Sequence, residues 1–313
     1  MDIAAPSVAR RAGAGGVLVL LGFLLVAPPV FVLGPLAALL AVSRPGNWRE
    51  RIWLAAAVTL TALSLGAPGD IAQQVVRAGA MGLAGATLAV AVAGRQSDPF
   101  RQSVTAVVAA AFGTVTWAAV LGMRFAAFRD TIADALRAQY QALAAGSSAS
   151  SSPEMQQLVQ SLVDSADMVA SLYPGMLVVL GVAGCMLAWQ WLHRIAATPV
   201  GRAPGRFRAF RFNDHVIWGG ILTLAAWLIP APEAVQLVAA NLLVAWAALY
   251  LVRGLAVATS LLAGSPWPMR VVAILFGILF LPFVSGALLA MGLADIWMDF
   301  RRRTPPVPGG HAE

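Results

Sequence analysis

Residues 234–263 read AVQLVAANLLVAWAALYLVRGLAVATSLLA, a run in which Arg253 is the single charged side chain. About 20 apolar residues in a helix cross the roughly 30 Å hydrocarbon core of a bilayer. This run exceeds that length, so it predicts a membrane-spanning helix.

The composition extends this prediction to the whole chain. Hydrophobic residues are 59% of the sequence and charged residues only 11%, whereas soluble domains carry about 25% charged residues. Further apolar runs are Val17–Val42, Ile52–Leu65, Ile71–Ala93, Val104–Met123, Pro174–Trp191, Val216–Ile229 and Val271–Met298. The expected fold class is all-α, a polytopic transmembrane helical bundle. We expect eight to ten membrane segments, and a first span broken by proline at Ala27-Pro28-Pro29 and again at Gly34-Pro35.

Basic residues indicate the orientation of the spans. All 21 of them are arginines, and the net charge is +7. Arginines beside apolar runs mark cytoplasmic loops and contact anionic lipid, so we expect the bilayer and not nucleic acid as the partner. The predicted location is the inner (cytoplasmic) membrane of a bacterium. The cytoplasmic basic contacts would be Arg202, Arg206, Arg208, Arg211, Arg301, Arg302 and Arg303.

Two places leave the number of crossings open. The arginine pattern is consistent only if Val17–Val42 crosses twice, and a cytoplasmic C-terminus requires a break near Leu281-Pro282. We expect one integral membrane domain over residues 1–313, with a disordered tail at 304–313. An outward-facing amphipathic helical loop would be inserted at 125–173.

That loop predicts two helices. One would begin at Asp130 and run to Ala145, and the other would begin at Ser152-Pro153-Glu154. The polar face of the second helix is acidic and lacks arginine, whereas helices that lie on anionic lipid carry Lys or Arg there; a mobile loop is the alternative. The loop is therefore expected to cap the protein or meet a partner.

Arg253 is the first candidate for a ligand-binding residue. An arginine inside a span is costly and marks a functional site by default; alternatively, a long tilted helix would let it reach the interface. Asn241 lies about three turns earlier and could instead bond a neighbouring helix. Asp295 and Asp299 share a helix face. They would bind a cation, pair with Arg253, or end the helix at the interface beside local arginines.

Other chemistry finds little support. Cys185 is the one cysteine, and three histidines share no spacing, so no disulfide or metal site is expected. The sequence has no phosphate-binding Gly-Lys-Ser/Thr loop and no recognisable catalytic constellation. We expect neither an enzyme nor a cofactor.

The C-terminal half carries a recognisable order of motifs. It runs from Phe210-Arg211-Phe212 through Leu249–Ala256 and Leu281-Pro282-Phe283 to Gly292–Arg302. This order resembles the YybS-like membrane proteins (DUF2232), which are distantly similar to the substrate-binding membrane subunits of energy-coupling factor transporters. In that family a polar uncharged residue, often Gln, is expected where Arg253 stands.

The resemblance implies a solute-binding transport subunit without its own ATPase. Such a subunit binds a small vitamin-like solute and docks on a transporter ATPase module or other membrane proteins. The alternative is a non-catalytic scaffold that recruits partners through its basic loop and tail.

Overall fold

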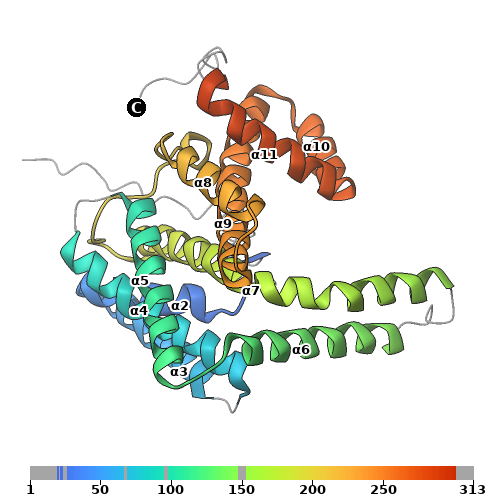
Figure 1. Ribbon diagram of the computed structural model, residues 1–313. Helices are drawn as coiled ribbons and strands as arrows, with labels where there is room; N and C mark the ends of the chain where they lie inside the picture. Colours follow the sequence, from blue (N-terminus) through green and yellow to red (C-terminus); the bar gives the residue numbers. More distant parts are fainter. Residues whose placement is uncertain are drawn as a thin grey trace, which may run out of the picture. The chain divides into compact units, whose positions relative to one another are not determined.

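The computed structural model of the protein describes residues 20, 22–23, 27–66, 69–94, 98–146 and 153–300 (Figure 1). Within those residues every regular element is helical, which confirms the all-α fold class. The helices are α2 (Val30–Val42), α3 (Trp48–Gly66), α4 (Ile71–Ala93), α5 (Pro99–Val120), α6 (Phe125–Gly146), α7 (Pro153–Ile195), η1 (Phe207–Ala209), α8 (Val216–Leu228), α9 (Glu233–Leu261), η2 (Leu262–Gly264), α10 (Trp267–Leu279) and α11 (Leu281–Met298).

Helix length and composition identify a membrane protein. Five of the described helical segments are long and apolar enough to cross a bilayer, namely α4, α5, α11, residues 156–195 of α7, and α9 with η2. Only 11% of the most apolar window in Glu233–Gly264 is buried within the protein. The other apolar side chains in that window therefore need lipid around them. Three further described helices are apolar but shorter, namely α2, α8 and α10. The number of eight to ten membrane segments stays a prediction.

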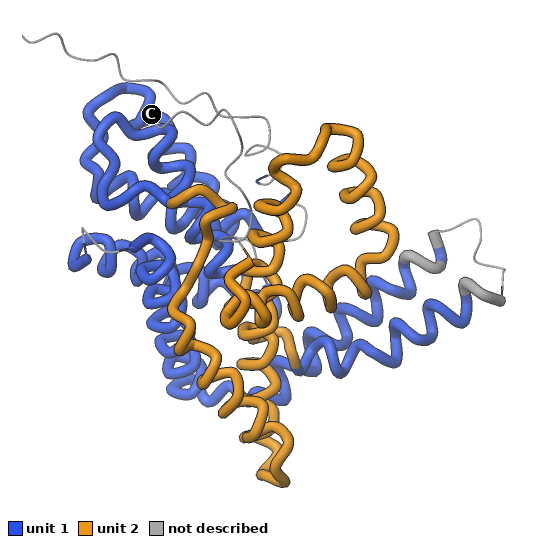
Figure 2. Tube along the Cα trace, turned by 90° about the horizontal axis from the view of Figure 1, so that it is seen from above, with its two compact units in different colours: residues 1–171, 180–204 blue, residues 172–179, 205–313 orange. Residues whose placement is uncertain are grey.

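The chain divides into two compact units (Figure 2). Unit 1 comprises residues 1–171 and 180–204, and unit 2 comprises residues 172–179 and 205–313. Helix α7 contributes to both units, because only its residues 172–179 group with unit 2.

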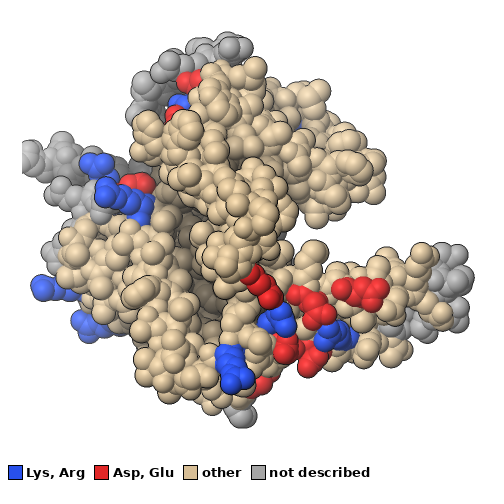
Figure 3. Space-filling view, viewed as in Figure 1, with Lys and Arg blue, Asp and Glu red and all other residues tan. Residues whose placement is uncertain are grey.

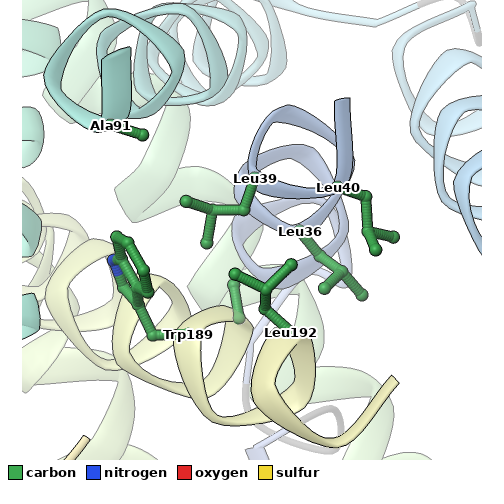
Figure 4. Packing of buried hydrophobic residues seen from close by; sticks show 7 residues of the cluster. Leu36, Leu39, Leu40, Ala91, Trp189 and Leu192 are labelled. Atoms are coloured by element: carbon green, nitrogen blue, oxygen red, sulfur yellow. The ribbon is translucent and has the colours of Figure 1, made fainter. Parts of the chain in front are cut away.

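The core of unit 1 is built around the short helix α2. Leu36, Leu39 and Leu40 of α2 pack with Ala91 of α4 and with Trp189 and Leu192 of α7 (Figure 4). Leu39 and Leu192 are completely buried. Helix α2 thus joins α4 to α7 although it is too short to cross a bilayer alone.

Proline has different effects at the two predicted breaks in this region. Helix α2 begins directly after Pro28-Pro29, as predicted. The predicted interruption at Gly34-Pro35 is wrong, because Pro35 lies inside α2. Pro35 has no N–H to offer the carbonyl of Phe31, four residues earlier. That carbonyl lies directly against Gly184 of α7, so close helix packing occupies the freed position.

The predicted outward loop consists of longer helices than expected. Helix α6 begins at Phe125, so Asp130 does not cap it, because buried Phe128 extends the apolar stripe towards the N-terminus. Helix α7 continues through Pro174, since a transmembrane helix tolerates the loss of one hydrogen bond when neighbours compensate. Its 43 residues span about 64 Å, roughly twice the hydrocarbon thickness.

One arginine joins the two helices of this loop. Arg137 of α6 pairs with Asp134 at 2.8 Å on its own helix and with Asp167 of α7 at 2.6 Å. Charged side chains gather along α6 and the first half of α7, whereas wide areas of the face in view carry no charge (Figure 3). The predicted outward location of 125–173 and the disordered tail stay predictions, and residues 304–313 lie outside the described part of the chain.

A buried carboxylate closes one end of unit 1. Glu50 precedes the apolar part of α3, and its Oε2 accepts hydrogen bonds from the N–H groups of Gly46 at 2.8 Å and Asn47 at 3.3 Å. Its Oε1 accepts from the N–H of Ala197 at 2.6 Å. The Ala197 amide foremost, and then the Asn47 and Gly46 amides, hold the pKa of Glu50 below its ordinary value.

This geometry predicts a pH-dependent contribution to stability. Because the pKa is lowered on folding, the Glu50 carboxylate stabilises fully above the ordinary carboxyl pKa of about 4.3 and progressively less as the pH falls below it. Glu50→Gln should therefore lower the melting temperature of the protein in detergent at pH 7, and the difference from wild type should shrink at pH 3.5. A difference that stays constant over this range would contradict the assignment.

The Phe31–Gly184 contact predicts a second stability effect. A Cβ at Gly184 would overlap the Phe31 carbonyl, and Gly184→Ala should cost about 1–3 kcal/mol. The matched control is Gly113→Ala in α5, where a Cβ meets nothing within 4 Å and helix propensity favours alanine. Melting temperatures in one detergent compare the two variants. An equal response from both would argue against close packing at Gly184.

Candidate functional site

Arg253 is completely buried in unit 2, and two of its three guanidinium nitrogens donate to carboxylates. Its Nε donates to Oδ2 of Asp295 at 3.0 Å, and its Nη1 donates to Oδ1 of Asp214 at 2.7 Å. The guanidinium carbon lies 5.3 Å from the centre of the Phe212 ring, a distance typical of a cation–π contact. The side chain is therefore held inside the unit by two carboxylates and an aromatic face.

Two glycines bring α9 and α11 close enough to form this cluster. Gly254 of α9 lies against the carbonyl of Leu288, and Gly292 of α11 lies against the carbonyl of Tyr250. A side chain at either glycine would overlap backbone atoms of the other helix. This approach places Asp295, one turn beyond Gly292, beside Arg253.

The segment before α8 supplies the remaining charged contacts. Asp214 reaches Arg253, and Arg211 pairs with Asp299 at 3.4 Å. Asp299 is the C-cap residue of α11 and adopts a left-handed conformation, with φ 40°. The end of α11 and the segment 205–214 thus lie at the same end of unit 2. The predicted break near Leu281-Pro282 is present, with Phe280 between α10 and α11.

Two buried donors of this cluster lack a hydrogen-bond partner among the described residues. They are Nη2 of Arg253 and the hydroxyl of Tyr250. Tyr250 precedes Arg253 by three residues and shares its helix face. The Phe212 ring contacts both, since its centroid lies 5.3 Å from that of Tyr250 in an edge-on arrangement. Unsatisfied buried donors are costly, and these two belong to side chains that contact the same Phe212 ring, where an acceptor group would satisfy them.

The structure separates the other predicted ligand residue from this cluster. Oδ1 of Asn241 accepts from the N–H of Gly175 in α7 at 2.7 Å, and its Nδ2 donates to the carbonyl of Leu237 at 2.9 Å. Asn241 lies about 18 Å along α9 from Arg253. Its contact is the helix–helix hydrogen bond that the sequence offered as an alternative.

The predicted basic contacts fall into three groups. Arg202, Arg206 and Arg208 are exposed, Arg211 pairs with Asp299, and Arg301, Arg302 and Arg303 lie outside the described residues. Among the described side chains, no three His, Cys, Asp or Glu residues are grouped as metal ligands would be.

The sequence prediction missed Asp214, Phe212 and Tyr250 as members of the cluster. Asp214 had a usable signal, because it is the first acid after a segment with five arginines. Phe212 and Tyr250 had none beyond their place in the motifs, since aromatic residues near span ends are common in membrane proteins.

The two carboxylates predict unequal effects of neutralisation. Asp295→Asn leaves a buried charge less compensated and should destabilise the protein by about 3–5 kcal/mol. Asp214→Asn should cost roughly 1–2 kcal/mol, because the side chain is 49% exposed and can be hydrated. Melting temperatures of both variants in detergent check this order. A larger loss for Asp214→Asn would show that Asp214, not Asp295, carries the packing of the cluster.

Comparison with known proteins places the chain in a family. A family model described as a predicted membrane protein (DUF2232) matches residues 16–296. Neither a curated protein nor a solved structure matches the chain. The family match includes Arg253, Asp295 and the whole segment before α8. Because the match extends over most of the 313 residues, the chain belongs to the DUF2232 family of predicted membrane proteins.

Proposed function

We propose that this protein is the solute-binding membrane subunit of a transporter and has no ATPase of its own. The observation that carries the proposal is the completely buried Arg253 with its two carboxylates and a free Nη2 among the described residues. Ionisable groups inside membrane segments are expensive, and they commonly mark solute or ion pathways.

Interrupted helices in unit 2 support this function. Helices α8 and α10 have 13 residues each, about 20 Å, which is short of the roughly 30 Å hydrocarbon core. Transporters commonly form their binding sites where short or broken helices expose backbone groups within the membrane. The break at Phe280 between α10 and α11 is a feature of this kind, about 22 Å along α11 from Asp295.

The energy source would be a separate protein. The sequence has no lysine and therefore no Gly-Lys-Ser/Thr loop to hold nucleotide phosphates. The similarity to energy-coupling factor subunits, which rests on the motif resemblance alone, suggests an ATPase module as the partner and a small vitamin-like molecule as the solute. We place the protein in a bacterial inner membrane on the arginine pattern.

A scaffold remains the second candidate because of the surface of segment 205–211. Arg206, Phe207 and Arg208 are all exposed there. Alternating arginine and phenylalanine suits a partner that combines negative charge with apolar groups. In this reading the Arg253 cluster only holds the segment in place.

Gentle purification from native membranes with mass spectrometry separates the two functions. A transport subunit should bring along an ATPase pair and a bound small molecule. Arg253→Gln should lose the small molecule, whereas Arg101→Gln, which changes an exposed arginine of α5, should retain it. Melting temperatures establish that both variants are folded. Copurification of soluble cytoplasmic proteins without an ATPase or small molecule would favour the scaffold.

A further inference from the structure

We infer that Asp214 is an internal occupant of the Arg253 site, and that a small monocarboxylate binds there by displacing it. The inference rests on the proposed function, for which it names the class of solute. It follows from a difference between the two carboxylates, from the donors around them, and from the balance of charge.

The two carboxylate partners of Arg253 are not equivalent. The Asp295 side chain is 0% exposed and lies on α11, which Gly254 and Gly292 pack tightly against α9. The Asp214 side chain is 49% exposed and lies in the segment between η1 and α8. Moving Asp295 away would separate two packed helices. Moving Asp214 away returns a half-hydrated carboxylate to water, so Asp214 is the exchangeable partner.

A free carboxylate could accept more hydrogen bonds from the donors around Arg253 than the Asp214 carboxylate does. Asp214 takes one hydrogen bond, from Nη1, and leaves Nη2 without a partner among the described residues. Nη1 and Nη2 form the flat edge of a guanidinium that binds a planar carboxylate through two parallel hydrogen bonds. Tyr250 offers a third buried donor beside the same Phe212 ring. A free carboxylate, unlike one tethered at Asp214, can accept from both Nη1 and Nη2, and Tyr250 lies on the same helix face as a further donor.

Charge balance selects a monoanion. A monocarboxylate replaces the charge of Asp214 one for one and leaves the field at Asp295 unchanged. A phosphate dianion would add negative charge beside the buried Asp295, and a neutral amide would leave Arg253 undercompensated. The site should therefore distinguish a carboxylate both from its amide and from phosphate.

Displacement would also change the surface of unit 2. The ion pair of Asp214 with Arg253 helps to hold segment 205–214 in place, as does the ion pair of Arg211 with Asp299. Losing Asp214 loosens the part that carries Arg206 and Arg208, which are sites of trypsin cleavage. Ligand binding should therefore increase the rate of trypsin cleavage after these two exposed arginines.

The experiment uses the purified full-length protein in detergent, with benzoate as the probe. Benzamide and inorganic phosphate at equal ionic strength are the ligand controls, and all titrations are made at pH 8, where phosphate is mainly the dianion. Titrations of melting temperature give the dissociation constants for wild type, Asp214→Asn and Asp164→Asn. Asp164 is a matched exposed aspartate of α7 in unit 1. Mass spectrometry measures the rate of trypsin cleavage after Arg206 and Arg208.

Asp214→Asn should bind benzoate about tenfold more tightly than wild type, because it removes the internal competitor. Asp164→Asn should match wild type, and benzamide and phosphate should bind none of the proteins measurably. Benzoate should speed cleavage after Arg206 and Arg208 in wild type. A purely structural Asp214 would instead make the variant bind no better.

Three results would overturn the inference. They are benzoate affinity that is unchanged or lower in Asp214→Asn, binding of benzamide as tight as that of benzoate, and absence of benzoate binding to either protein. The proposed function fails separately. Benzoate binding without an ATPase in the native purification keeps the carboxylate site and removes the transport module. Copurification of an ATPase with a protein that binds no carboxylate would keep the transport module and remove the carboxylate site.

Discussion

The charge of Arg253 is the constraint on which unit 2 depends. A guanidinium does not lose its proton in a protein, so a completely buried one must meet negative charge where it lies. Asp295 supplies that charge from α11, and Asp214 supplies it from the segment before α8. Three elements far apart in the sequence are thereby fixed at one side chain. Apolar packing alone would specify their positions less sharply, since lipid is as apolar as the helices are.

Glycines allow the close helix packing on which these ion pairs depend, and a similar glycine contact occurs in unit 1. Helices α9 and α11 approach until Gly254 and Gly292 touch backbone carbonyls, and Gly184 touches the carbonyl of Phe31 in the same way. In a bilayer, helices associate through such close packing and through polar contacts. Helix α4 offers a milder case, because a Cβ added at Gly82 would lie at ordinary contact distance from Ala110 of α5.

The sequence predicted what depends on local pattern and missed what depends on tertiary contact. Apolar runs gave the helical membrane fold, and the cost of a buried charge singled out Arg253. Gly34-Pro35 was predicted to break the first span because the local effect of proline is strong, yet packing keeps Pro35 inside α2. Asp214 lies 39 residues from Arg253, and no periodicity relates a residue before α8 to one late in α9.

The unequal exposure of the two carboxylates also indicates which side of the Arg253 cluster is accessible. The cluster is closed at Asp295 and exposed at Asp214, so under the proposed function a solute would reach Arg253 from the side of segment 205–214. The arginines of that segment predict that this side faces the cytoplasm. The arrangement described here would then be open inward, the state in which an importer releases its solute. An outward-open state would require α9 and α11 to part at Gly254 and Gly292. Under the proposed function, the close packing at these two glycines would oppose that motion, and the inward arrangement would then be the resting one.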